Sequence, residues 1–94
     1  MTPETKLKNQ CLRYLKSLGS ECWFFKVAGG PGQKAGVPDI VGCYRGKFFA
    51  VENKSEKGKP SPKQLREIDS IAAAGGSVQI VRTLGELESM MEGM

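Results

Sequence analysis

The sequence predicts an α/β fold in which a mixed β-sheet is flanked by helices, in the order α-β-β-β-α-β-α. Three stretches carry apolar residues at helical spacing behind an N-capping signal. Between them stand four short runs of branched and aromatic residues, bounded by turn-forming residues. No internal repeat and no linker interrupts the 94 residues, so we expect one domain over residues 1–94.

Each expected helix begins at a recognisable cap. Thr2 precedes Pro3, which suits the first helical position. The segments 61–64 and 83–86 are capping boxes, with Ser or Thr at the cap and Gln or Glu three residues later. The apolar faces of the three helices consist of Leu7, Cys11, Tyr14, Leu15, Leu18, Leu65, Ile68, Ile71, Ala72, Leu84, Leu87, Met90 and Met91.

The expected strands cover residues 22–27, 39–44, 47–53 and 77–82. The first of them, Cys-Trp-Phe-Phe-Lys-Val, favours a well-buried strand. The glycine-rich stretch 28–36 is a loop that either borders a substrate groove or simply connects two strands. Six aromatic residues are candidates for stacking on bases, but their places on apolar stripes and strands favour core packing. They are Tyr14, Trp23, Phe24, Phe25, Phe48 and Phe49.

Basic residues are concentrated away from the C-terminus. The net charge is +4, yet the last twelve residues hold three of the ten acids and no base, so residues 1–82 carry 14 basic and seven acidic side chains. The densest basic cluster contains one acid and consists of Lys54, Lys57, Lys59, Lys63 and Arg66. Such a cluster either binds phosphates, because neutralised phosphates release counterions, or solubilises the surface.

The chain contains no histidine. This excludes Ser-His-Asp and Cys-His triads, histidine-based one-metal nucleases and Cys/His zinc sites. Cys11, Cys22 and Cys43 are widely spaced, which indicates reduced, mostly buried thiols in a cytoplasmic protein, or in the host cytoplasm if the protein is viral. We expect no signal peptide and no membrane span, because no apolar run is long enough.

A hairpin is expected to bring two acids and a lysine together. If Arg45-Gly46 is a two-residue turn, Asp39 stands opposite Glu52, and Lys54 projects from the same face as Glu52. A three-residue loop with Gly46 in the left-handed region is the alternative. That register places the two acids on opposite faces, and a bulge would be needed to restore the cluster.

Opposed carboxylates destabilise a sheet unless a positive charge lies between them. Mg²⁺ or Mn²⁺ suits this place, because hard cations prefer carboxylate, carbonyl and water oxygens. Asp39 and Glu52 are the candidate ligands, and the backbone carbonyl of Asn53 is a further one. Lys54 is then placed to orient or deprotonate an attacking water, or to stabilise the charge of a transition state.

Two segments, Gly36–Ile40 (GVPDI) and Phe49–Lys54 (FAVENK), resemble the PD-(D/E)xK nuclease signature. Over almost its full length the chain resembles a small, stand-alone, phage-type VRR-NUC domain (virus-type replication-repair nuclease). The ordered motifs are an early acid in the first helix, a G-x-P-D strand, an ExK strand and Ser-Pro-Lys-Gln opening a helix. The resemblance implies a restriction-endonuclease-like core and a divalent-metal-dependent DNA endonuclease.

The family's functional positions can be transferred one by one. Asp39 and Glu52 match its metal-binding acids, and Lys54 matches its catalytic lysine. Glu4 matches the helix-one acid that helps to complete the metal site, although the helix dipole also favours an acid in a first turn. Gln64 matches the glutamine of the second helix, although it also fits the capping box.

The resemblance also suggests the substrate and the assembly. Small stand-alone members resemble dimeric Holliday-junction resolvases, so we expect a homodimer that cuts four-way junctions; a flap- or branch-specific nuclease is the alternative within the family. The apolar faces of the first helix or of the terminal helix are the candidate dimer interfaces. A non-catalytic nucleic-acid-binding module and a small scaffold protein are the alternatives outside the family. The expected DNA-binding side chains are Lys57, Lys59, Lys63, Arg66 and Lys34.

Overall fold

The computed structural model describes all residues from 1 to 94 and confirms the expected order of elements. The helices are α1 (Pro3–Ser17), α2 (Pro62–Ala73) and α3 (Leu84–Glu92), and the strands are β1 (Cys22–Lys26), β2 (Ile40–Tyr44), β3 (Lys47–Asn53) and β4 (Ser77–Val81). A short 3₁₀ turn, Gly19–Glu21, was not expected and joins α1 to β1. Thr2, Ser61 and Thr83 cap the three helices as predicted. None of the helices is long and apolar enough to cross a membrane.

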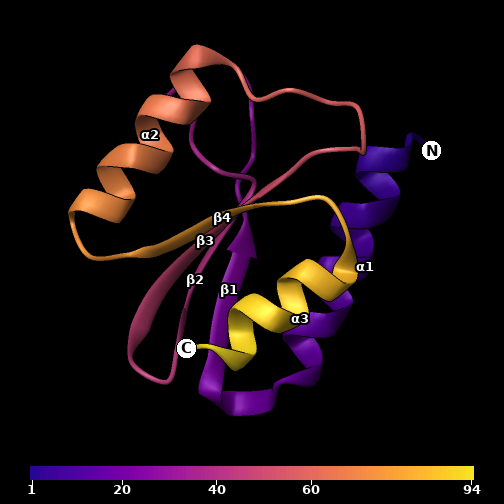
Figure 1. Cartoon of the computed structure of the whole chain (residues 1–94), viewed down its shortest axis with the longest axis vertical. Coiled ribbons are helices and arrows are strands. Elements are labelled where there is room, and N and C mark those ends of the chain that lie inside the picture. The colour runs from indigo at the N-terminus through magenta and orange to yellow at the C-terminus, as the bar shows by residue number, and fades with distance from the viewer.

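The four strands form one mixed sheet in the order β1-β2-β3-β4. The pairs β1–β2 and β2–β3 are antiparallel, whereas β3 and β4 run parallel. The parallel pair needs a crossover connection, which α2 provides. Figure 1 shows α1 and α3 together on one side of the sheet and α2 on the other.

The main core lies between the sheet and the helix pair α1 and α3. Its buried side chains include Leu15, Phe49 and Leu87, none of which is exposed to solvent. Leu7, Cys11, Met90 and Met91 belong to the same cluster. The prediction that the apolar face of the first or the terminal helix forms a dimer interface is therefore wrong, because these two faces pack against the sheet of their own chain.

The opposite sheet face is only partly covered, and here two predictions fail. β1 is an edge strand whose alternation turns Trp23 and Phe25 away from α1, so they are 64% and 48% exposed. Phe48, 46% exposed, shares their face. The predictions of a well-buried first strand and of core packing for these three aromatic residues are wrong. Core packing is confirmed for Phe49, and Tyr14 and Phe24 pack against the core from partly buried positions.

The hairpin has the two-residue turn. Tyr44 pairs with Lys47, and the backbone φ angles of Arg45 and Gly46 are 51° and 82°. Two consecutive positive φ angles match the twist of a hairpin. Arg45 adopts this uncommon conformation while its side chain pairs with Glu21 at 2.6 Å. The three-residue alternative is wrong, and the register puts Asp39 next in line opposite Glu52.

Candidate active site

Glu52 is the most unusual polar residue of the sheet. It lies on β3, on the side that α2 covers, and is only 1% exposed. Its Oε2 accepts a hydrogen bond of 2.9 Å from Gln64 Nε2 and lies 3.5 Å from Lys54 Nζ. Its Oε1 is buried and has no hydrogen-bond partner. Buried polar atoms are almost always paired, so this oxygen calls for a functional explanation.

The environment of Glu52 favours its protonated form. The pKa of this carboxyl is raised from 4.5 to about 7, chiefly by burial and next by the negative charge of Asp39. The ammonium of Lys54 acts in the opposite direction, and Glu4 adds a smaller upward effect. A buried acid whose pKa is raised by a second acid is typical of functional sites, because binding a cation relieves both causes.

Asp39 is held against β3 by its own side chain. It comes directly before β2, and its backbone oxygen accepts a hydrogen bond of 2.7 Å from the Val27 N–H. Its Oδ2 accepts a 2.8 Å bond from the Asn53 N–H, and its Oδ1 lies 3.5 Å from Lys8 Nζ. The second acid is therefore fixed to the backbone of the residue that follows Glu52.

Gly36 allows the segment before Asp39 to approach α2 closely. Its φ angle is 85°, and a Cβ at this position would lie 2.6 Å from the carbonyl oxygen of Lys63. No other residue type combines this backbone conformation with this clearance. The glycine of the G-x-P-D motif thus packs the acid-bearing segment against the first turn of α2, which carries Gln64.

The two acids suit a divalent cation. A buried carboxylate oxygen without a partner stands beside a second carboxylate, and Mg²⁺ is commonly held by one or two carboxylates together with waters and phosphate oxygens. No group of three or more His, Cys, Asp or Glu side chains is arranged to hold a metal. The structure thus brings Asp39 and Glu52 together without gathering Glu4 into the same group. Glu4 and the Asn53 carbonyl stay predicted ligands.

Gln64 has the predicted capping role and also contacts Glu52, while its catalytic role stays a prediction. Its Oε1 accepts a 2.8 Å hydrogen bond from the Ser61 N–H, which completes the capping box. Its Nε2 donates to Glu52 Oε2. The Ser61 N–H therefore orients the side-chain amide of Gln64, and this amide holds Oε2 of Glu52. Oε1 of Glu52 is left without a partner.

Two substitutions separate these roles. Ser61→Ala removes the hydroxyl that caps α2 and should lower the free energy of unfolding by about 1 kcal/mol without changing the DNA cleavage that the family resemblance implies. Gln64→Ala removes both side-chain bonds, to the Ser61 N–H and to Glu52, and we expect the single-turnover cleavage rate to fall about tenfold or more. Urea unfolding and single-turnover cleavage of both variants make the test. Equal cleavage by the two variants would restrict Gln64 to the cap.

The predicted DNA-binding residues lie on the surface. Lys57, Lys59, Lys63 and Arg66 are exposed and form no ion pair, whereas Lys34 lies 3.1 Å from Glu67 of α2. Arg82 was not among the predicted site residues, and its Nη1 donates to the carbonyls of Ser55 and Gly58 at 2.7 Å each. Arg82 thereby orders the loop that carries Lys57 and Lys59. No local sequence pattern distinguishes it from an ordinary surface arginine.

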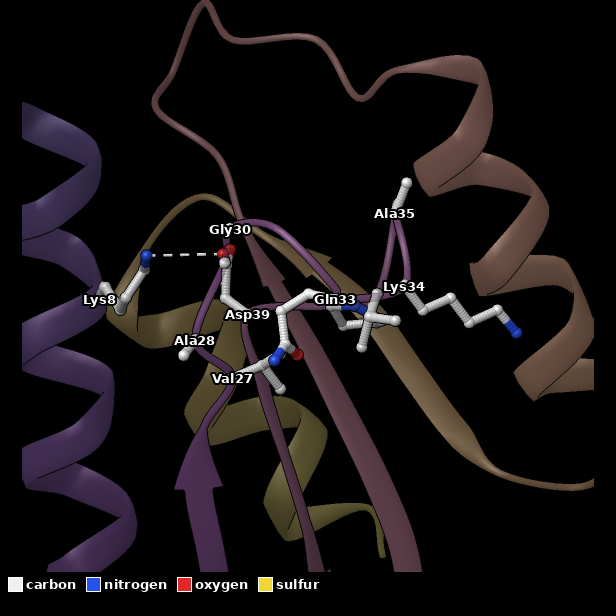
Figure 2. Close-up of a pocket in the computed structure, with 12 residues that line it drawn as sticks. Lys8, Val27, Ala28, Gly30, Gln33, Lys34, Ala35 and Asp39 are labelled. Atoms are coloured by element: carbon white, nitrogen blue, oxygen red, sulfur yellow. Dashed lines mark ion pairs between the residues drawn. The ribbon is translucent and has the colours of Figure 1, made fainter.

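A pocket of about 480 Å³ is lined by Asp39 and not by Glu52. The glycine-rich loop 28–36 forms much of its wall, which supports the interpretation of this loop as the rim of a groove. Figure 2 shows Lys8 reaching from α1 towards Asp39, while Lys34 extends towards α2. Lys8 was also missed, because from the sequence it is one of several polar residues around the first helix.

Solved structures resemble this arrangement over the whole chain. One, titled a VRR_NUC domain, matches with a TM-score of 0.79 and 28% sequence identity, covering 98% of this chain and 97% of that one. The chain folds as a VRR-NUC domain. A second structure, titled a VRR_NUC domain protein, also reaches a TM-score of 0.79 at 15% identity, covering 99% of this chain and 88% of its own.

The chain also resembles Hjc, a Holliday junction resolvase from Archaeoglobus fulgidus. The TM-score is 0.62 at 19% identity, covering 84% of this chain and 67% of that one. This confirms the restriction-endonuclease-like fold. No family model and no curated protein matches the sequence. These structural similarities support the interpretation of the chain as a nuclease of the superfamily to which VRR-NUC domains belong.

Proposed function

We propose that residues 1–94 form one nuclease domain that hydrolyses DNA phosphodiester bonds with the help of Mg²⁺ or Mn²⁺. The observation that carries the proposal is the buried, unpaired Oε1 of Glu52 next to Asp39 and Lys54. A purely structural glutamate at this place would be costly, because a buried acid without full pairing destabilises the fold. The geometry therefore favours a functional role for the pair of acids.

The residues divide the work between them. Asp39 and Glu52 would hold the cation, with the Asn53 carbonyl and Glu4 as further ligands, directly or through water. When bound, the cation would polarise the phosphate and lower the pKa of an attacking water. Gln64 and Lys54 both contact Glu52 Oε2 and so keep Oε1 free. Lys54, on the same side, can orient the water or stabilise the charge that develops on the phosphate.

The basic side chains around the site would bind the DNA backbone. Lys57 and Lys59 stand on the loop that follows Lys54, and Lys63 and Arg66 stand in the first half of α2. These four are exposed and unpaired, so each can neutralise a phosphate. Lys34 would join them by exchanging its partner Glu67 for a phosphate.

A four-way junction is the substrate that we propose. Support comes from the similarity of the fold to that of a Holliday junction resolvase with 19% sequence identity. Symmetric cutting of two strands requires two sites related by a two-fold axis, and a chain this small supplies one. We therefore propose that the active form is a homodimer.

The proposed dimer interface is the aromatic face, which we define as Trp23, Phe25 and Phe48. Trp23 and Phe48 both neighbour Cys43 in the sheet, so they form a row across three strands. Half-exposed aromatic rings of this size offer roughly 300 Å² of apolar surface per copy, enough for the centre of an interface with a polar rim. The aromatic face lies on the same side of the sheet as Glu52.

Trp23→Glu should convert the dimer into a folded monomer, because an unpaired charge at the centre of an interface is costly. Light scattering after size-exclusion chromatography measures the change. Ser89→Glu adds the same charge at an exposed position of α3, and this variant should remain a dimer. A wild-type monomer would contradict the dimer; if Trp23→Glu then weakened junction binding, the aromatic face would be a DNA contact instead.

The three cysteines support a reducing compartment. All are free, with Cys11 and Cys22 buried and Cys43 exposed, which confirms the prediction of mostly buried thiols. Free thiols are common in compartments where cysteines are kept reduced. We propose that the protein acts in the cytoplasm, or in the host cytoplasm if it is viral.

Cleavage of a labelled four-way junction tests the proposed function. We expect cutting with Mg²⁺ or Mn²⁺, none with EDTA, and much slower cutting of a linear duplex of the same sequence. Binding without cutting in any metal would favour the non-catalytic binding module. Faster cutting of a flap than of the junction would favour the flap- or branch-specific alternative.

A further inference from the structure

Lys8 is the one basic residue that contacts an acid of the candidate metal pair from outside the PD…ExK motif. Its Nζ lies 3.5 Å from Asp39 Oδ1, and both side chains are 23% exposed. Its backbone is held in place because the neighbouring α1 positions Leu7 and Cys11 are buried in the core. The ammonium is therefore attached to a fixed helix and carried by a flexible stem.

The two carboxylate oxygens of Asp39 differ in how easily their partners can move away. Oδ2 accepts from the Asn53 N–H, a backbone donor fixed within β3. Oδ1 faces the ammonium of Lys8, which can turn away. A cation that binds Asp39 through Oδ1 thus meets the positive charge of Lys8, whereas a site that uses Oδ2 must break a backbone hydrogen bond.

The pocket beside Asp39 gives the ammonium of Lys8 space into which it can turn. Lys8 and Asp39 both line the pocket beside the glycine-rich loop, and this pocket also contains Gln33 and Lys34. The pocket borders Asp39, with Lys8 at its wall (Figure 2). We therefore expect a phosphate of bound DNA near the reacting one to come within reach of Lys8. A released ammonium is a good partner for such a phosphate.

We propose that Lys8 is an exchanging counter-ion of the site. It pairs with Asp39 in the absence of a cation and turns to a backbone phosphate of the DNA when the cation takes its place. This inference rests on the proposed metal-dependent function. It assigns Lys8 two opposite effects: it weakens the binding of free metal ions and strengthens the binding of DNA.

Titration calorimetry with MnCl₂, without DNA, tests the first effect. Lys8→Met should bind Mn²⁺ about tenfold more tightly than the wild type, because a unit charge close to a divalent ion is removed. Lys16→Met removes the same charge from an exposed position on the same helix and should bind Mn²⁺ like the wild type. Unchanged or weaker Mn²⁺ binding by Lys8→Met would overturn the proposal.

Fluorescence anisotropy of a labelled four-way junction in Ca²⁺ tests the second effect. The slope of log affinity against log salt should fall by about one for Lys8→Met, and Lys8→Arg should restore it, as expected for one phosphate contact. Lys16→Met should keep the wild-type slope. A wild-type slope in Lys8→Met, or no restoration by Lys8→Arg, would overturn the phosphate contact.

The calorimetric experiment also separates this inference from the proposed function. If the wild type binds no Mn²⁺, the metal-dependent function fails and the inference about Lys8 fails with it. If the wild type binds Mn²⁺ and Lys8→Met binds it equally well, only the inference about Lys8 fails.

Discussion

Replacing Glu52 with Gln should abolish junction cleavage and at the same time make the metal-free protein more stable at pH 8. The substitution keeps the shape of the side chain but removes the charge that the cation needs. We expect cleavage to fall about 10³-fold or more, together with the loss of Mn²⁺ binding. A gain of stability from the loss of an essential group is typical of functional sites.

The pKa of Glu52 gives the direction of the stability change. The carboxyl has a pKa of about 7 in the folded protein against 4.5 as the ordinary value, so between these values the folded state holds a proton that the unfolded state has released. Stability therefore falls as the pH rises from 4.5 to 7, by about 3 kcal/mol in total, and stays low above pH 7. Glu52→Gln removes this fall, and after the cost of its own buried amide we expect a gain of about 1–2 kcal/mol at pH 8.

Urea unfolding in EDTA at pH 5 and pH 8 measures this effect. The wild type should lose stability between the two values, whereas Glu52→Gln should lose much less. Adding Mn²⁺ at pH 8 should stabilise the wild type and leave the variant unchanged. Glu56→Gln, an exposed position in the next loop, is the matched control and should behave like the wild type. Stabilisation of Glu52→Gln by Mn²⁺ would contradict the assignment.

Replacing Lys54 with Met should abolish cleavage by a different route, with metal binding retained. Lys54 Nζ lies 3.5 Å from Glu52 Oε2, and its charge lowers the pKa of Glu52. Without it the pKa of Glu52 rises further, so Mn²⁺ binding should shift to higher pH. At pH 8.5 we expect Mn²⁺ affinity equal to the wild type or tighter, while cleavage falls by about 10²- to 10⁴-fold.

Calorimetry and single-turnover cleavage of Lys54→Met, side by side, test this split. Lys47→Met is the control, because it changes an exposed lysine at the other end of β3 and should alter neither quantity. Cleavage at the wild-type rate by Lys54→Met would move the chemistry to another residue. Loss of Mn²⁺ binding at pH 8.5 would make Lys54 a support of the metal site instead of a participant in the reaction.

The order of elements and the centre of the site could be predicted from the sequence because both depend on local signals. Caps at Thr2, Ser61 and Thr83 mark the helix starts. The hairpin limited the register to two alternatives, and the two-residue turn found in the structure is the one that sets Asp39 opposite Glu52. In a hairpin, the type of turn determines the register, and the register determines which residues of the two strands lie opposite each other.

The failures all concern contacts between distant segments. Alternation in β1 predicts two faces but not that one of them lacks a covering helix, which is why Trp23 and Phe25 were wrongly placed in the core. The apolar faces of α1 and α3 were proposed as interfaces because the sequence does not show that these helices share one side of the sheet. Lys8 contacts Asp39 because of the way α1 packs on the sheet. Arg82 contacts the loop after β3 because of the course that this loop takes.

A crystal structure of the wild type soaked in Mn²⁺ tests the central claim most directly, because the anomalous signal of manganese locates the ion without assumptions about the chemistry. We predict an ion in contact with carboxylate oxygens of both Asp39 and Glu52, including Oε1 of Glu52. Well-diffracting crystals with no anomalous peak at these two residues, or with a peak at another place only, would contradict the account.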